Sequence, residues 1–411
     1  MEADTLDPKR NRWTGYRWFW VTSAMVLLLL TMIALGPLFM RGRNRWAIIR
    51  GLPQNCSIQF DPVVPARVRS LIGEANCRRL FDRPHKLSIR CEDWKPTVLT
   101  DLSSVEELET LEEMEIRSAF IPKSQLPRIP APPSVRRLRM ANYLTVCSES
   151  CVIEAADTKP WKPEFAWEGK DMAFLSRFHD LRELELRAVW LRTGVMDVVG
   201  GLTQLEVLSL SHSDFPSDEL PSLRRLQKLR VLTFWYPPQS MHSLEWLREV
   251  ESLEELTLVG CRGVDAKMLA PLAQLPRLHT LRLDNGSLMD DVWPALAAFP
   301  HLKVLTLSNT NRFALNPFSA DRVKTFTLAQ APQLWAPEST GGFRQLEWLN
   351  IENEYFYTPE ALQAVVTSLP EGCKVVVNRY HLGKYSSLLP PKMAAQLTGQ
   401  LRTDLELPVE Y

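Results

Sequence analysis

Leucines recur in the middle of the chain in one short pattern, L-x-x-L-x-L, at an almost constant interval. Five copies are spaced 24 or 25 residues apart, and they begin at Leu205, Leu229, Leu253, Leu278 and Leu302. Because side chains alternate along a strand, the fourth and sixth positions of each copy point to one face. A single strand cannot bury such a face alone. The repetition therefore predicts parallel strands that stack on a shared core.

The segments between these strands predict short helices. Residues that cap helix N-termini recur at a similar offset after the strands, namely Ser217, Asp265, Asp290 and Thr358. Apolar residues follow at helical spacing, as at Met268 and Leu272. Each repeat is thus expected to consist of a strand, a turn and a capped helix.

Repetition at this interval with this signature resembles the leucine-rich repeat superfamily. More narrowly, residues 18–380 resemble membrane-anchored leucine-rich repeat proteins of bacterial type. The resemblance implies an α/β solenoid, with a curved parallel sheet of about ten strands on the concave face and short helices on the convex face. It also implies protein recognition through the repeat surface, without catalysis.

Repeats are predicted over residues 85–378. Weaker copies begin near Leu87, Leu111 and Val135, and further copies at Val323 and Leu346 follow the regular series. The interval from Val135 to Leu181 is 46 residues, close to two periods, so residues 143–170 are predicted to be an insertion, with a disguised repeat as the alternative. Residues 379–411 are expected to form a C-terminal cap and tail.

The N-terminal region predicts a transmembrane helix over residues 18–40, after a tail of residues 1–17. Residues 18–35 carry no charge, and a helix continued to Met40 would be about 35 Å long, enough to cross the hydrocarbon core. A cleaved signal peptide is the alternative, because Ala34-Leu35-Gly36 loosely fits a cleavage site. The apolar run exceeds the usual length of a signal peptide, which favours an uncleaved anchor that contacts membrane lipid.

Basic residues do not decide the orientation of this anchor, since four precede it and four follow it closely: Lys9, Arg10, Arg12, Arg17, Arg41, Arg43, Arg45 and Arg50. A short N-terminal tail with the bulk translocated is the commoner arrangement, so the repeat domain is predicted on the extracytoplasmic side. Residues 41–84 are predicted to be a juxtamembrane segment and N-terminal cap. A basic helix around Val68 and Leu71 could instead lie on the membrane surface; its modest apolar stripe favours the cap.

Composition and charge exclude several functions. Lys plus Arg and Asp plus Glu both number 48, and the pI is about 7.1, so the chain lacks the basic footprint of a nucleic-acid binder. Seven histidines and seven cysteines show no metal-ligand spacing, and no catalytic residue, metal or small-molecule cofactor is predicted. Cys147 and Cys151 are either a disulfide or two loosely placed thiols, whereas Cys261 is expected to be buried.

The candidate binding site lies on the concave face of the predicted sheet. There, His212, Trp235, Tyr236 and Val259 should form one patch, which neighbouring strands extend with Thr257, Arg282 and Asp284. Aromatic side chains with a polar end are typical of interface hot spots; ordinary surface residues are the alternative. Trp348 is expected about 24 Å away. Glu113 and Glu115 should lie beside Arg137 and Arg139 in a cross-strand charge ladder.

Three functions remain open at this point. The sequence favours a membrane-anchored module that binds a protein partner. The alternative is a structural envelope protein whose solenoids pack together. An enzyme adaptor is disfavoured, because neither end of the chain leaves room for a recruiting or catalytic domain.

Overall fold

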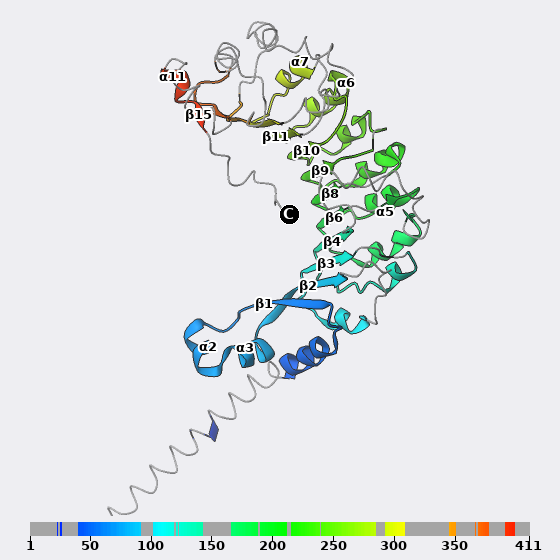
Figure 1. Cartoon of the computed structure of the whole chain (residues 1–411), viewed down its shortest axis with the longest axis vertical. Coiled ribbons are helices and arrows are strands. Elements are labelled where there is room, and N and C mark those ends of the chain that lie inside the picture. The colour runs from blue at the N-terminus through cyan, green and yellow to red at the C-terminus, as the bar shows by residue number, and fades with distance from the viewer. Residues whose placement is uncertain are drawn as a thin grey trace, which may run out of the picture.

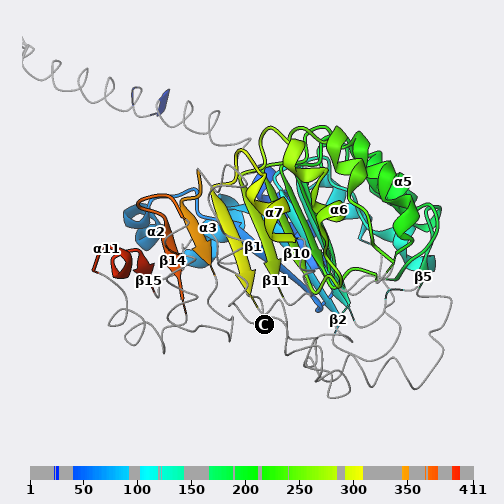
Figure 2. The same ribbon diagram turned by 90° about the horizontal axis from the view of Figure 1, so that it is seen from above.

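The chain is a curved solenoid in the computed structural model, which describes residues 23, 25–26, 40–91, 102–118, 121, 123–142, 166–187, 190–211, 215–238, 240–284, 292–308, 345–350, 366, 369–377 and 391–398. Strands line the inner, concave side, and short helices follow the outer side (Figure 1). The view from above shows α5 and α6 outside the stack of strands (Figure 2). The predicted leucine-rich repeat architecture is thereby confirmed.

One sheet runs through the whole described molecule. Its thirteen strands, in spatial order, are β1 (Cys56–Asp61), β2 (Arg83–Cys91), β3 (Glu113–Ser118), β4 (Arg137–Asn142), β6 (Glu183–Arg187), β8 (Val207–Ser211), β9 (Val231–Trp235), β10 (Glu255–Val259), β11 (Thr280–Asp284), β12 (Val304–Ser308), β13 (Trp348–Asn350), β14 (Lys374–Val376) and β15 (Leu397–Thr398). Strand β1 is antiparallel to β2, and every later pair is parallel. A second small sheet pairs β5 (Ala166–Trp167) with β7 (Trp190–Leu191).

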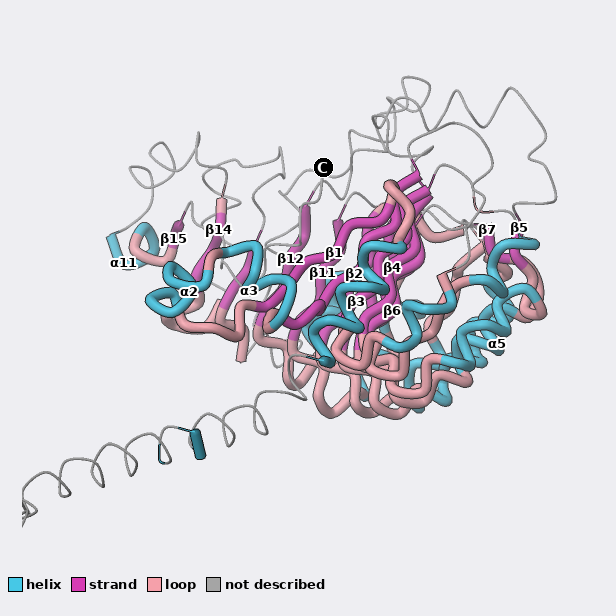
Figure 3. Tube along the Cα trace, turned by 90° about the horizontal axis from the view of Figure 1, so that it is seen from below, coloured by secondary structure: helices cyan, strands magenta, loops and turns pink. Residues whose placement is uncertain are grey.

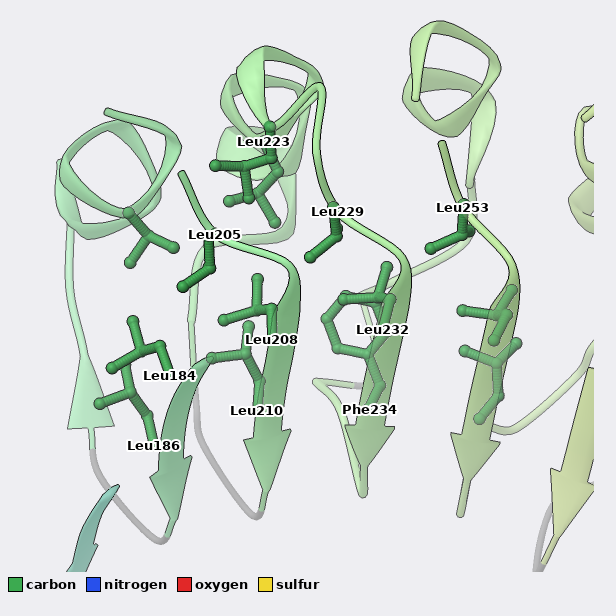
Figure 4. Close-up of a cluster of buried hydrophobic side chains, with 14 of the residues drawn as sticks. Leu184, Leu186, Leu205, Leu208, Leu210, Leu223, Leu229, Leu232, Phe234 and Leu253 are labelled. Carbon is green, nitrogen blue, oxygen red and sulfur yellow. The ribbon is translucent and has the colours of Figure 1, made fainter. Parts of the chain in front are cut away.

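The constant interval between repeats produces a constant register, and the register builds the core. Leu232 pairs with Leu208 on one side and with Leu256 on the other, and Leu256 pairs in turn with Leu281. All four side chains are fully buried. Figure 4 shows Leu208, Leu232 and neighbouring core residues stacked in columns between the strands and the outer turns. Each repeat therefore buries its apolar face against the next one.

The outer side consists mainly of 3₁₀ helices, where short α-helices were expected. The 3₁₀ segments are η1 (Ser103–Glu107), η2 (Lys123–Arg128), η5 (Asp171–Arg177), η6 (Ser217–Arg225), η7 (Glu245–Glu249) and η8 (Leu272–Gln274). The α-helices on this side are α5 (Val195–Gly200), α6 (Ala266–Leu269) and α7 (Val292–Ala297), and α11 (Pro391–Ala394) lies near the C-terminal end. Figure 3 separates the helical and strand layers by colour. Leu220, Leu223 and Leu226 recur every third residue, which is the period of a 3₁₀ helix.

Of the four predicted caps, Asp265 is confirmed, because its side chain accepts a hydrogen bond from the Met268 amide at 2.8 Å. Ser217 is not a cap; its hydroxyl hydrogen-bonds to Ser240. Asp290 and Thr358 lie outside the described residues.

The pairing of strands corrects the predictions about repeat number, and the sheet has thirteen strands where about ten were expected. Strand β12 pairs directly with β13, so the copy predicted at Val323 adds no strand between them. The separation of Trp348 from Trp235 is therefore four strand spacings, about 19 Å, and not five. Strand β15 pairs with β14 and extends the sheet into the predicted C-terminal tail. Strand β4 pairs directly with β6, so residues 143–170 place no strand of this sheet between them.

The N-terminal end of the solenoid holds a helical segment at residues 40–51, then β1, α2 (Ala66–Ile72) and α3 (Glu74–Leu80). Of the span predicted at residues 18–40, the described part comprises Ser23, Met25, Val26 and Met40. Among the residues described, no helix combines the length and the apolar character that crossing a membrane requires.

Candidate functional site

The concave face divides into two parts. On β2, β3, β4 and β6 the inner positions carry charges except at Ser88 and Ala141. On β8, β9 and β10 they carry Val, Ser, Thr and Trp, and Glu255 is the one charge among the inner positions of these three strands. We call the first part the charged ladder, and it consists of Lys86, Glu113, Glu115, Arg117, Arg137, Arg139, Glu183, Glu185 and Arg187. We call the second part the neutral sector, and it consists of Val207, Ser209, Ser211, Val231, Thr233, Trp235, Thr257 and Val259.

The charged ladder is held together by ion pairs, most of them between neighbouring strands and one within β3. The Lys86 ammonium lies 2.7 Å from a carboxylate oxygen of Glu113 and 3.2 Å from one of Glu115. Arg117 pairs with Glu115, and Arg139 lies 3.4 Å from Glu185. The predicted register of Glu113 with Arg137 and of Glu115 with Arg139 is confirmed. The carboxylates are not exposed, however, because the side chains of Glu113 and Glu115 are 9% and 4% accessible.

Two carboxylates of this ladder have pKa values shifted in opposite directions. Burial opposes ionisation of Glu115, but hydrogen bonds and charges from Arg117 and Lys86 outweigh it, so its pKa lies below the usual range. Burial dominates at Glu183 and is reinforced by the charges of Glu113 and Glu206, so its pKa is raised despite the nearby arginines. Attraction by neighbouring cations therefore prevails over burial at Glu115, whereas burial prevails at Glu183, which lies next to the neutral sector.

At the end of the neutral sector, Tyr236 directly follows β9 in a left-handed conformation. Its φ is +51°, and within the described part of the chain it is the one non-glycine residue with a positive φ. Its amide donates a hydrogen bond of 2.6 Å to the Val259 carbonyl. The ring lies against Gly260, where a Cβ atom would come within 2.3 Å of Tyr236 Cδ1. Glycine at position 260 is therefore required to accommodate the ring.

A cavity of about 140 Å³ opens beside this ring. It is lined by Tyr236, Pro237, Pro238, Met241, Gly260, Cys261 and Arg262. Small-molecule and cofactor sites are usually about 300–1,000 Å³. This cavity is therefore the size of one side chain and not of a cofactor. Burial raises the pKa of the Cys261 thiol to about 12, so the thiolate that nucleophilic chemistry needs is disfavoured.

The structure brings most of the predicted site residues together. Val259 is in register with Trp235 on one side and with Asp284 on the other, and Thr257 is in register with Arg282. Trp235, Tyr236, Arg282 and Asp284 are half-buried. His212 lies outside the described residues.

Two predicted site residues are corrected. Val259 is 1% exposed and Thr257 is 8% exposed, so neither presents the open surface that the strand pattern predicted. Adjacent strands lie about 4.8 Å apart, so short side chains are shielded by longer ones in register with them. Trp235 and Asp284 flank Val259 in this way. Val259 and Thr257 therefore pack under the longer side chains of the site and are not themselves available for contact with a partner.

The cavity was missed by the sequence pattern, although a signal for it exists. Pro237 and Pro238 follow two consecutive aromatic residues, which marks a turn with a fixed backbone after β9. The left-handed conformation of Tyr236 has no signal in the sequence, because tyrosine rarely adopts it. Among the residues described, no three His, Cys, Asp or Glu side chains gather as a metal site would require.

No protein-family model matches the chain. Solved structures to which it is similar include an internalin C2 from Listeria monocytogenes, with 18% identity over 57% of this chain and 74% of that chain and a TM-score of 0.32. An internalin (InlF) from the same organism has 14% identity over 76% and 87% of the two chains and a TM-score of 0.36. The TLR13–ssRNA13 complex has 14% identity over 71% and 35%, with a TM-score of 0.36. The leucine-rich repeat fold of this chain rests on its own strand register and leucine core, as described above.

Proposed function

We propose that the chain is a membrane-tethered interaction module that binds a protein partner through the neutral sector and the adjoining part of β11. The observation that carries this proposal is the change along the concave face. In the charged ladder, the buried carboxylates of Glu113 and Glu115 are paired with cations of the ladder itself. The neutral sector instead offers Trp235 and, directly after it, Tyr236, which lines a cavity of side-chain size. Trp, Tyr and Arg dominate binding hot spots.

The physical reason is desolvation. A partner that covers the charged ladder must remove water from several ionised groups, and this costs free energy that new contacts have to offset. In the neutral sector, Val207, Ser209 and Val231 are half-buried neutral residues, which are cheaper to desolvate, and the remaining Ser and Thr side chains are already buried. An apolar side chain of the partner would fill the cavity beside Tyr236, which Arg262 also lines, and the half-buried Arg282 and Asp284 of β11 would offer polar contacts nearby.

The test uses photocrosslinking in native membranes. A photoreactive amino acid at Ser209, which is half-buried on the concave face, should form an adduct with the partner. Adding Trp235→Ala should reduce the adduct at least about tenfold, since a hot-spot truncation costs about 2 kcal/mol or more. The matched control is Trp348→Ala on β13, which removes the same side chain from the same face and should leave the adduct unchanged.

Three outcomes would contradict the proposal. Equal loss in the Trp235 and Trp348 variants would point to a general effect on the fold. An unchanged adduct in Trp235→Ala would remove the aromatic anchor from the site. An adduct between two copies of this chain would instead support the alternative function, in which solenoids pack together.

The membrane tether at residues 18–40 and the extracytoplasmic position of the repeat domain are part of the same proposal. The tether is supported by the uncharged run over residues 18–35, which is long enough for most of a membrane-spanning helix. We expect the chain to stay in the membrane fraction after alkaline carbonate washing, and external protease to digest the repeat domain in intact cells. Recovery of the chain in the soluble fraction would contradict the tether, and full protection from protease would reverse the orientation.

A further inference from the structure

Helix α2 buries a charged side chain and exposes apolar ones, which is the reverse of a typical helix on the surface of a soluble protein. One of its two arginines, Arg69, faces the protein, where the side chain is 12% exposed and pairs with the buried carboxylate of Asp82. Arg69 Nη1 lies 2.9 Å from Asp82 Oδ2 and 3.1 Å from Glu74 Oε1. Asp82 also accepts a hydrogen bond from the Val63 amide at 3.3 Å. An ion pair therefore holds the inner side of α2, and no residue of this helix is buried.

The exposed residues of α2 include large apolar side chains beside Arg67 and Ser70. Leu71 is 86% exposed, Val68 is 42% exposed, and Val63, just before the helix, is 48% exposed. Residues 68 and 71 are one helical turn apart and share a face. Within the described residues, the other large apolar side chains with such exposure are Met25, Val26 and Met40, all in the predicted span. The described repeats from residue 84 onwards expose none. Exposed apolar side chains gathered at one end of a molecule indicate a surface that something covers.

The same end of the molecule is strongly basic. Residues 40–83 contain nine arginines against three carboxylates, a net charge of +6 in a chain whose total is zero. Two of the three carboxylates, Asp82 and Glu74, are paired with Arg69. The arginines crowd one another, since burial and then the charges of Arg83 and Arg41 lower the pKa of Arg45. Exposed arginines on this end are Arg41, Arg43, Arg50, Arg67, Arg78 and Arg79.

This basic end is also where the predicted span meets the solenoid. The helical segment at residues 40–51 begins at Met40, and its Gly42 lies so close to α3 that a Cβ atom would come within 2.1 Å of the Leu80 carbonyl oxygen. Helix α3 contacts α2 in turn. Figure 1 shows α2, α3 and this segment together below β1. A bilayer around residues 18–40 would therefore lie next to α2.

We propose that α2 and the loop before it dock on the surface of an anionic lipid bilayer. Leu71, Val68 and Val63 enter the headgroup region, and the exposed arginines lie over lipid phosphates, as in basic amphipathic helices that lie in the membrane interface. This inference rests on the proposed tether at residues 18–40. It reverses the preference drawn from the sequence, because β1 pairs with the first parallel strand of the sheet and α2 buries nothing.

The test places a probe on Leu71 in the full-length protein. Leu71→Cys, labelled with an environment-sensitive fluorophore, is reconstituted into vesicles of phosphatidylcholine alone or with phosphatidylglycerol. In the anionic vesicles we expect emission at shorter wavelength and quenching by lipid-borne nitroxides, and a loss of both at high salt. Glu251→Cys, exposed on the outer side of the repeats, is the matched control and should report water throughout. Unsubstituted protein, labelled in parallel, gives the background from native cysteines.

A second pair of variants tests the role of charge. Arg67→Gln with Arg79→Gln should weaken quenching of the Leu71 label in anionic vesicles, whereas Arg224→Gln with Arg248→Gln, on exposed outer turns, should not. Alkaline extraction of the same vesicles reports the tether separately. A chain that stays inserted while its Leu71 label remains water-exposed overturns the α2 contact alone. A chain that is extracted from the vesicles overturns the tether and the contact together.

Discussion

The charged ladder and the neutral sector occupy equivalent positions on one sheet, yet the first buries ionised side chains and the second buries neutral ones. Taken over the whole residue, Glu113 and Glu115 in the ladder are 7% and 3% exposed, and Thr233 and Thr257 in the neutral sector are 9% and 8% exposed. Similar burial is thus achieved with ionised groups in one part and with neutral groups in the other. In the ladder, the buried Glu113 and Glu115 depend on nearby cations, namely Lys86 of β2 and, for Glu115, Arg117 of the same strand. The neutral sector relies on the leucine core alone, which both parts share.

This difference teaches that exposure alone does not identify a binding surface. Ion pairs between strands make the ladder a structural unit, because removal of one partner leaves the other charge buried. The neutral sector does not depend on such ion pairs, and it lies next to Tyr236 and the cavity that this residue lines. We therefore expect partner binding at the part of the concave face that lacks ion pairs between strands.

The largest effect should come from breaking the core that both parts share. Leu256 is fully buried between Leu232 and Leu281, and Leu256→Asp would place a carboxylate there without a partner. We expect a loss of about 4–5 kcal/mol or more and no cooperative thermal transition by circular dichroism. Leu256→Met, which nearly conserves volume, should cost less than about 1.5 kcal/mol. A cooperative transition in the Asp variant would show that the core is not continuous.

A smaller effect should distinguish the two parts directly. Glu115→Gln removes the charge that Arg117 and Lys86 share, and it should lower the free energy of unfolding by about 2–3 kcal/mol, because both cations are largely buried. Thr257→Val is the matched change in the neutral sector and should alter stability by less than about 1 kcal/mol. Chemical denaturation of the two variants measures the difference. Equal losses would mean that the ladder is not a unit of its own.

The smallest effect concerns pH, and it should have opposite signs within the ladder. The pKa of Glu115 is lowered on folding, so its contribution is present above the ordinary value of 4.5 and is lost as pH falls through the folded pKa. The pKa of Glu183 is raised, so its ionised form destabilises the fold above the folded pKa, and this penalty disappears as pH falls.

Glu183→Gln should therefore stabilise the protein at pH 7 by up to about 1 kcal/mol. The gain should vanish below pH 4.5, the ordinary value for this carboxyl, where both states are protonated. Denaturation curves recorded between these two conditions check the sign. A variant less stable than the parent at pH 7 would indicate that the attraction of the nearby arginines outweighs burial.

Much of the fold was predictable because it depends on local periodicity. The positions of the strands, the leucine columns and the pairing of Glu113 with Arg137 all follow from a fixed repeat length. The Asp265 cap was predictable for the same reason, since the hydrogen bond spans three residues. The candidate site was predictable only in part. The pattern identified the residues on its face, but not that Thr257 and Val259 are covered or that a cavity opens beside Tyr236.

By itself, then, the sequence determined which side chains share a face, because alternation and repeat length are properties of the local backbone. Tertiary structure alone decided which strands meet across long connections, as β12 and β13 do, since a connection of any length can join two strands in register. It also decided which way α2 faces. Arg69 pairs with Asp82, thirteen residues further along the chain, and this pairing turns Leu71 outward. Such an ion pair forms only when the chain folds, so the spacing of residues in the sequence does not reveal it.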